Sequence, residues 1–120
     1  NKFLTSSLCA EFTAENVTVE REFDFISTIP LSKVKSTAPE FADEPVILQG
    51  CADLIGVRSG NGLILVDYKT DALTDPAQFL TRYKAQLDLY AEALSRIFGL
   101  PVLKKSIWSF KLGREIKVPD

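Results

Sequence analysis

The sequence predicts an α/β (α+β) fold, in which a long helix covers one face of a mixed β-sheet. Three observations support this prediction: apolar and polar residues alternate early in the chain, one long segment repeats its apolar residues every three or four positions, and two short apolar segments follow it. Alternation is typical of a half-buried strand, and the longer spacing is typical of an amphipathic helix. The expected order is three strands, one helix and two strands.

The N-terminal third predicts a short helix and a long strand. In residues 2–12 apolar side chains recur at near-helical spacing, so this segment is expected to include the end of a helix. In residues 17–29 the odd positions are mostly apolar and the even positions mostly polar, which indicates a half-buried strand. Residues 30–45 are polar and contain three prolines, which predicts an irregular connection.

The middle of the chain predicts an antiparallel hairpin. Residues 46–58 and 63–69 are apolar enough for two strands, and the turn-forming sequence Ser-Gly-Asn-Gly at 59–62 separates them. Pairing across this turn sets residues whose numbers sum to about 121 opposite each other, which brings Asp53 within reach of Asp67.

Residues 76–98 are the most clearly predicted element. Asp75 followed by proline is a typical helix start, and Gly99 is a typical helix end. Between them, apolar and aromatic residues recur every three or four positions. Residues 102–110 and 115–118 predict a closing pair of strands.

The composition is that of one globular domain and excludes several functions. The 120 residues are 46% hydrophobic and 25% charged, with a formal net charge of −2. No apolar run approaches the roughly 18 residues of a membrane-spanning helix, and the charge is unlike that of an autonomous nucleic-acid-binding domain. Because the first residue is not methionine, we expect residues 1–120 to be a single domain cut from a longer protein.

The absence of histidine removes the classes of catalytic site that need an imidazole, such as Ser-His and Cys-His nucleophiles and histidine-ligated zinc. Catalysis must therefore depend on carboxylates, lysine, tyrosine or glutamine. Cys9 and Cys51 form no CxxC pair, and we expect both to be reduced thiols in the core.

Candidate catalytic residues lie near the end of the predicted hairpin. Side chains alternate along a strand, so Asp67 and Lys69 point to the same face. Asp53 joins them from the neighbouring strand, and two adjacent carboxylates are costly unless a cation compensates them. Such ligands suit Mg²⁺ or Mn²⁺, and a lysine beside them can polarise water for phosphodiester hydrolysis. The alternative interpretation is a surface salt bridge between Asp67 and Lys69 with a solvated Asp53.

The predicted helix adds two polar side chains to this set. Gln86 and Tyr90 are four residues apart and therefore share one face of the helix. On the face that meets the sheet, both could orient a water molecule or a DNA phosphate. The alternative interpretation is that they form the polar edge of an apolar stripe that packs in the core.

Taken together, these segments resemble the RecB-like branch of the PD-(D/E)XK nucleases. The resemblance rests on GxxD at residues 50–53, VDYKT at 66–70 and QxxxY at 86–90, in that order along the chain. The surrounding sequence is more similar still to the C-terminal nuclease domains of the bacterial ATP-dependent helicase-nuclease family AddA, also called RexA. The implied fold is a restriction-endonuclease-like mixed sheet.

The resemblance also implies a role for each matched residue. Asp53 and Asp67 are the expected metal ligands, with the main-chain carbonyl of Tyr68 as a further ligand of Mg²⁺ (or Mn²⁺). The expected catalytic lysine is Lys69. On the helix, Gln86 and Tyr90 are expected to lie beside the scissile phosphate. Glu22 matches an acidic position to which we assign no role.

The implied activity is that of an Mg²⁺-dependent deoxyribonuclease, an exonuclease, in a cytoplasmic helicase-nuclease that acts in double-strand break repair and recombination. The implied partners are DNA, helicase domains upstream in the same chain and a second subunit of the AddB/RexB type, with no membrane. RecB-like nucleases usually add a metal-binding histidine from an upstream helix, and this sequence has none. Two alternatives therefore stay open: an inert DNA-binding or structural module of the same fold, and a stand-alone repair or restriction nuclease.

Overall fold

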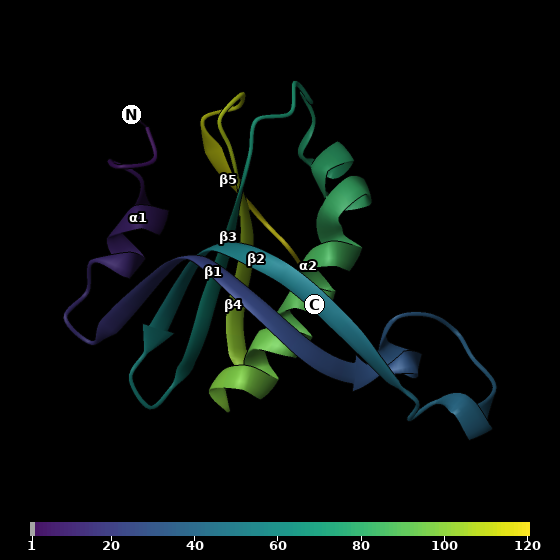
Figure 1. Ribbon diagram of the computed structural model, residues 1–120. Coiled ribbons are helices and arrows are strands. Elements are labelled where there is room, and N and C mark those ends of the chain that lie inside the picture. The colour runs from purple at the N-terminus through teal and green to yellow at the C-terminus, as the bar shows by residue number, and fades with distance from the viewer. Residues whose placement is uncertain (1) are drawn as a thin grey trace.

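The protein folds as a mixed five-stranded sheet with a long helix across one face, as the sequence predicts (Figure 1). The computed structural model describes residues 2–120. The helices and strands follow the expected order: α1 (Ser7–Phe12), β1 (Val17–Pro30), β2 (Pro45–Arg58), β3 (Gly62–Lys69), α2 (Pro76–Phe98), β4 (Val102–Ser109) and β5 (Arg114–Lys117). No helix within residues 2–120 combines the length and the apolar character needed to cross a bilayer.

The strands lie in the sheet in the order β1-β2-β3-β4-β5. Only β3 and β4 run parallel, because α2 carries the chain back between them, whereas the other neighbours are antiparallel. In the β2–β3 hairpin, Leu54 pairs with Val66, so the paired numbers sum to 120. This agrees to within one residue with the expected sum of about 121. The loop has three residues, and Gly60 in it adopts a left-handed φ of 74°.

Two hydrophobic clusters cover the two faces of the sheet. Leu63 and Leu65 of β3 belong to the cluster beneath α2, and Ile64 and Val66 belong to the cluster on the α1 side. The strict alternation predicted for this strand is thus confirmed. It follows that Asp67, the next odd position, lies on the face covered by α2.

Strand β1 has the predicted alternation, but its apolar side chains move from one face of the sheet to the other part of the way along the strand. Val19 packs against the cluster on the α1 side, whereas Phe25 belongs to the cluster beneath α2, although both are odd positions. On β2, Leu54 and Ala52 change sides in the same way. On β1, Glu22 lies between Val19 and Phe25 and has a positive φ of 48°. This change of backbone direction lets the β1–β2 ribbon cross from one layer to the other.

The helix expected to end within residues 2–12 is α1, which occupies only the second half of that segment. It begins only after Ser6, whose Oγ accepts a hydrogen bond from the Cys9 amide at 3.0 Å and so caps the helix. Phe3 packs from the preceding turn against Trp108, with ring centroids 5.2 Å apart. The helical spacing was misleading for Leu4, which is 70% exposed.

The bounds of α2 agree with the prediction. Asp75 caps its start through a capping box with Gln78, and Gly99 ends it with a left-handed φ of 68°. The side chains that α2 buries against the sheet include Phe79, Leu87, Ala91, Ala93 and Leu94.

The connection between β1 and β2 is irregular, as expected. It contains two short 3₁₀ turns, Leu31–Lys33 and Pro39–Phe41, and no other regular element. Strands β1 and β2 are each 14 residues long, and the connection lies at the far end of the ribbon they form (Figure 1).

Core packing predicts a large effect for Leu87→Ala. Leu87 is fully buried beneath α2, so its truncation should lower the free energy of unfolding by about 2–5 kcal/mol. Ile97→Ala on the same helix is the matched control, since Ile97 is 42% exposed and should cost about 0.5 kcal/mol or less. Urea denaturation measures both values, and equal losses would contradict the assigned core.

Candidate active site

The candidate site lies at the end of β3, on the face that α2 covers. Asp67 is only 6% exposed. Lys69, two residues further on, places its Nζ 2.8 Å from Oδ2 of Asp67. Because the carboxylate is enclosed, this contact is not the surface salt bridge of the alternative interpretation.

Asp53 approaches the same place from β2. Its Oδ2 accepts a hydrogen bond from the main-chain N–H of Tyr68 at 2.8 Å, which holds the carboxylate against β3. The Asp53 side chain is also among the causes that raise the pKa of Asp67, so the two carboxyl groups are neighbours in this site. The structure therefore brings together the three side chains that the sequence singles out at the hairpin, Asp53, Asp67 and Lys69.

The electrostatics of the site are dominated by the enclosed carboxylate. Burial, followed by the contact with Asp53, raises the pKa of Asp67 to about 6, even though Lys69 acts in the opposite direction. Burial alone would lower the pKa of Lys69, but its interaction with Asp67 outweighs burial and raises it. A single ammonium group thus does not fully compensate the two carboxylates.

One oxygen of Asp67 has an unusual environment. Its Oδ2 is buried and accepts no hydrogen bond of regular geometry from the described residues, although the Lys69 ammonium lies nearby as an ion-pair partner. Such an oxygen is free to accept a further cation. Within residues 2–120, no group of three or more His, Cys, Asp or Glu side chains is arranged to hold a metal ion. Asp53 and Asp67 are the two carboxylates that the described residues bring to the end of β3.

Helix α2 supplies a neighbour of Lys69 that sequence reasoning missed. The Nζ of Lys69 lies 4.1 Å from the ring centroid of Tyr83, within the range of a cation–π interaction. The Tyr83 hydroxyl donates a 2.6 Å hydrogen bond to Oδ2 of Asp71, and Arg82 donates to the same oxygen at 2.8 Å. In the sequence Tyr83 belongs to an apolar helical stripe, so its spacing indicates only a core residue.

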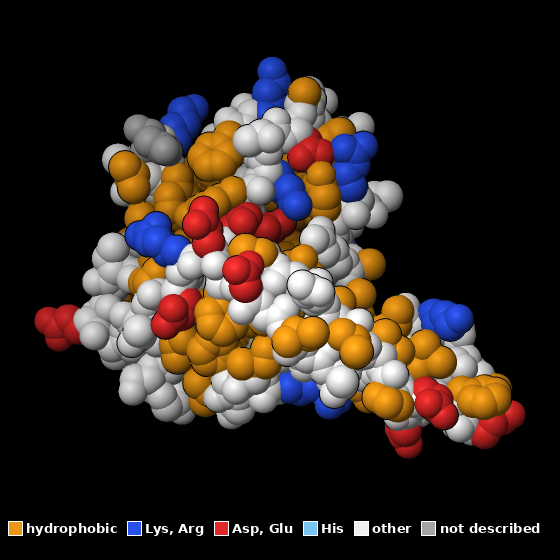
Figure 2. Space-filling model, viewed as in Figure 1, with side chains coloured by type: hydrophobic (Ala, Val, Ile, Leu, Met, Phe, Trp, Pro, Cys, Tyr) orange, Lys and Arg blue, Asp and Glu red, His pale blue; other side chains and the backbone are white. Residues whose placement is uncertain are grey.

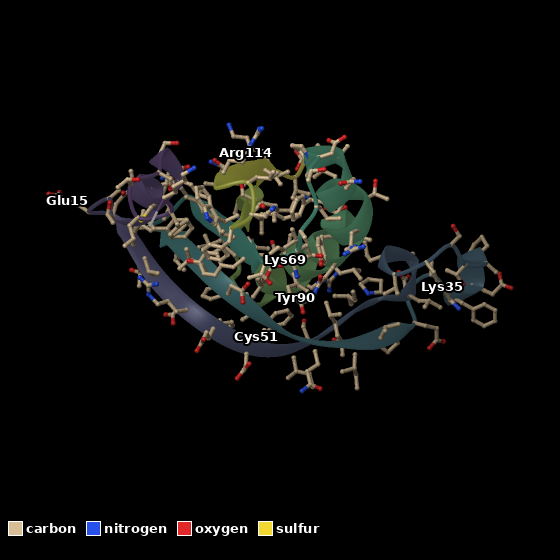
Figure 3. The ribbon with its side chains drawn as sticks, turned by 90° about the horizontal axis from the view of Figure 1, so that it is seen from above. Glu15, Lys35, Cys51, Lys69, Tyr90 and Arg114 are labelled. Carbon is tan, nitrogen blue, oxygen red and sulfur yellow. The ribbon has the colours of Figure 1, made fainter. Side chains whose placement is uncertain are left out.

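Gln86 and Tyr90 lie on the side of α2 that meets the β1–β2 ribbon. The Gln86 Nε2 donates to the Tyr90 hydroxyl at 3.3 Å, and the Tyr90 ring meets Phe25 edge-on with centroids 5.0 Å apart. Seen from above, the labelled Tyr90 and Lys69 both lie between the ribbon and α2 (Figure 3).

Contact with Tyr90 explains why glycine stands at position 50. A Cβ atom added to Gly50 would lie 2.6 Å from the ring and hydroxyl of Tyr90, which is closer than real contacts allow. The GxxD segment of β2 and the QxxxY segment of α2 therefore touch directly. The sequence reveals both segments but not their contact.

The outer surface near the site is acidic. Acidic side chains gather over the middle of β1 and β2 (Figure 2).

The cysteine expected in the core at position 51 is instead exposed, and its pKa is raised by desolvation and by a hydrogen bond with Asp24. The other cysteine, Cys9, is half-buried, and both thiols are free. The core expectation fails for Cys51 because its side chain lies on the face of the ribbon opposite α2.

Comparison with known proteins identifies relatives of this chain. A family model described as the PD-(D/E)XK nuclease superfamily matches residues 4–118. A protein of Desulforamulus reducens, named as the A-type subunit of an ATP-dependent helicase/nuclease, is 39% identical over 102 residues. The match covers 83% of this chain and 8% of that protein.

Two further relatives carry the same name. The protein of Ligilactobacillus salivarius is 31% identical over 114 residues, covering 95% of this chain and 9% of the relative. The protein of Clostridium botulinum strain 657 is 34% identical over 119 residues, covering 98% of this chain and 9% of the relative. The chain thus spans less than a tenth of the length of the relatives it matches.

The close approach at position 50 predicts that Gly50→Ala displaces the Tyr90 ring. Overpacking of this kind should lower the free energy of unfolding by about 1–3 kcal/mol. In a Tyr90→Ala background the added methyl group has room, so Gly50→Ala should cost much less there. A double-mutant cycle measured by urea denaturation checks this, and additive effects would contradict the contact.

The raised pKa of Asp67 predicts a pH-dependent stability in the absence of divalent cations. Between the ordinary pKa of 3.8 and the folded-state pKa of about 6, the folded protein binds more protons than the unfolded chain. The associated stabilisation is complete below pH 3.8 and is lost as the pH rises through about 6. Urea denaturation in EDTA at pH 5 and pH 7 should show a smaller pH difference for Asp67→Asn than for the wild type. An equal difference in both proteins would contradict the assignment.

Proposed function

The chain belongs to the PD-(D/E)XK nuclease superfamily, and we propose that it is the metal-dependent deoxyribonuclease domain of a longer helicase-nuclease. The observation that carries this proposal is the meeting of two carboxylates and one ammonium group at the end of β3. These groups are what hydrolysis of a phosphodiester needs from a protein that contains no histidine.

The residues present fit a divalent cation. The enclosed Oδ2 of Asp67 lacks a regular hydrogen bond, and the acidic pair with Asp53 lacks full compensation. Mg²⁺ or Mn²⁺ suits such a donor set, because Mg²⁺ commonly uses one or two carboxylates and takes its other ligands from water and phosphate. We propose the main-chain carbonyl of Tyr68 as a further ligand. When bound, the cation supplies Lewis-acid stabilisation of negative charge on the phosphate.

The chain's own residues perform the remaining tasks. Lys69 is proposed to donate a hydrogen bond from its ammonium group to the attacking water or to the scissile phosphate. Gln86 and Tyr90 offer an amide and a hydroxyl from α2, and both can orient the same water or phosphate. Burial of Asp67 excludes bulk water from one side of this site and so strengthens each charge interaction.

The names of the relatives support a wider setting for this domain. We propose that helicase domains lie upstream in the intact protein, that DNA is the substrate and that a second subunit of the AddB/RexB type completes the complex. Exonuclease action in double-strand break repair and recombination, in the cytoplasm, belongs to the same proposal.

A second candidate function is an inert DNA-binding or structural module of the same fold. The observation that favours it is the donor set, because residues 2–120 contain no group of three or more His, Cys, Asp or Glu side chains arranged to hold a metal ion. The two functions differ in whether the chain binds a divalent cation and cleaves DNA.

Cleavage assays with Asp67→Ala and Lys69→Ala separate these functions. We expect the wild type to cut labelled single- or double-stranded DNA with Mg²⁺ or Mn²⁺, and both variants to lose about 10²-fold or more in rate. Calorimetric titration should show that Asp67→Ala loses metal affinity while Lys69→Ala retains it.

Lys35→Ala, at an exposed lysine in the connection at the far end of the β1–β2 ribbon, is the matched control and should cut at the wild-type rate (Figure 3). Folding of each variant is checked by circular dichroism. A folded wild type that neither binds the metal nor cuts DNA would favour the inert module. An equal loss of metal affinity in both variants would contradict the separate role of Lys69.

A further inference from the structure

We propose that Tyr83 is a positioning residue, whose ring holds the Lys69 ammonium group in the site while a divalent cation occupies the Asp53–Asp67 pair. This inference rests on the proposed nuclease function and adds a part to it that neither the sequence pattern nor the family match assigns. It is carried by the contacts of Lys69 and by the bonds that fix the Tyr83 ring.

Within residues 2–120, two groups lie in direct contact with the Lys69 ammonium group, and the Asp53 carboxylate adds a weaker charge interaction. One is the Asp67 carboxylate, 2.8 Å from Nζ, and the other is the face of the Tyr83 ring, 4.1 Å from Nζ to the centroid. The Lys69 side chain is 19% exposed, so water solvates it only in part. Both neighbours therefore contribute to holding the ammonium group on this side of β3.

These two neighbours respond differently to a bound cation. The oxygen that Lys69 contacts is the enclosed Oδ2 of Asp67, and in the proposed site this carboxylate also binds the metal ion. Two positive charges on one carboxylate repel each other, so metal binding weakens the hold of Asp67 on Lys69. The Tyr83 ring carries no net charge, and its attraction for the ammonium group persists.

The Tyr83 ring is held in place by a hydrogen bond from its hydroxyl group. Asp71, two residues beyond Lys69 in the chain, accepts hydrogen bonds from the Tyr83 hydroxyl and from Arg82 at one oxygen, Oδ2. The hydrogen bond from Tyr83 is the main reason that the pKa of Asp71 lies below its ordinary value. These bonds tie α2 to the segment that follows β3, so the ring face stays turned towards Lys69.

A purely structural role for Tyr83 has different consequences. Packing against the cluster beneath α2 needs only an apolar side chain of similar size, and leucine would serve. Holding an ammonium group needs an aromatic face, which phenylalanine supplies and leucine does not. The Tyr83 hydroxyl is bonded to Asp71 and is therefore not free to act on a substrate.

The test compares Tyr83→Leu with Tyr83→Phe, and Phe98→Leu serves as the matched control for loss of a ring from α2. The Phe98 ring lies 5.4 Å from Phe23, not on Lys69. The first readout is the NMR shift of the Lys69 ε-methylene protons, which a ring face moves upfield. It is measured in the 120-residue chain without metal and during titration with Mg²⁺. The second readout is kcat and KM for DNA cleavage.

We expect the wild type to keep the upfield shift when Mg²⁺ is added. Tyr83→Phe keeps the ring face but loses the hydrogen bond to Asp71, so it should retain most of the shift and a kcat within about threefold of the wild type. Tyr83→Leu should lose the shift and about a hundredfold in kcat, with KM and the Kd for Mg²⁺ unchanged, because the lysine is no longer held in its productive position. Phe98→Leu should match the wild type in both readouts.

Three outcomes would overturn the proposal: a wild-type shift that disappears on Mg²⁺ binding, a wild-type kcat in folded Tyr83→Leu, or an equal loss of kcat in Tyr83→Phe and Tyr83→Leu. A wild type that cuts no DNA would refute the proposed function instead, and the Mg²⁺ titration of the Lys69 shift would still decide the role of Tyr83. If Tyr83→Leu does not fold, the wild-type titration and Tyr83→Phe decide it.

Discussion

The enclosed carboxylate of Asp67 is the constraint to which the rest of the site responds. Its neighbour Asp53 adds a second negative charge, and together with burial this raises the pKa of Asp67 to about 6. Lys69 offsets part of the charge, and the Tyr68 amide hydrogen-bonds to Asp53. A carboxylate pair that its own protein compensates only in part is a poor structural device but a good cation ligand, since a divalent ion supplies the missing charge.

Helix α2 is the element that surrounds this pair with aromatic and polar side chains. Near its start, Tyr83 meets Lys69 through the ring face, and two turns later Tyr90 packs on the ribbon at Gly50. The helix therefore contacts β3 and the β1–β2 ribbon at once, on both sides of the carboxylates. A shift of α2 along the sheet would change the lysine contact and the Gln86–Tyr90 pair together, which couples packing of the helix to the arrangement of the site.

The crossing of the β1–β2 ribbon places Asp53 where it is needed. Glu22 and Asp53 lie at corresponding positions of the two strands, between Arg21–Leu54 and the next pair along. At this point the apolar side chains change from the α1 layer to the α2 layer, and Glu22 has a positive φ. Backbone strain of this kind persists only where the surrounding structure holds it, and here it accompanies the candidate site.

Much of the fold could be predicted from the sequence, because it depends on local periodicity, helix caps and short motifs. This holds for the order of elements, the ends of α2, the common face of Asp67 and Lys69, and the family. The hairpin register was predicted to within one residue. The change of layer at Glu22 and the contact of Tyr83 with Lys69 became visible only in the folded chain. Alternation along a strand predicts which side chains are buried, but it does not predict whether the α1 layer or the α2 layer covers them. Likewise an aromatic residue in a helical stripe has the same pattern whether its ring meets a leucine or an ammonium group, since the partner comes from a distant part of the chain.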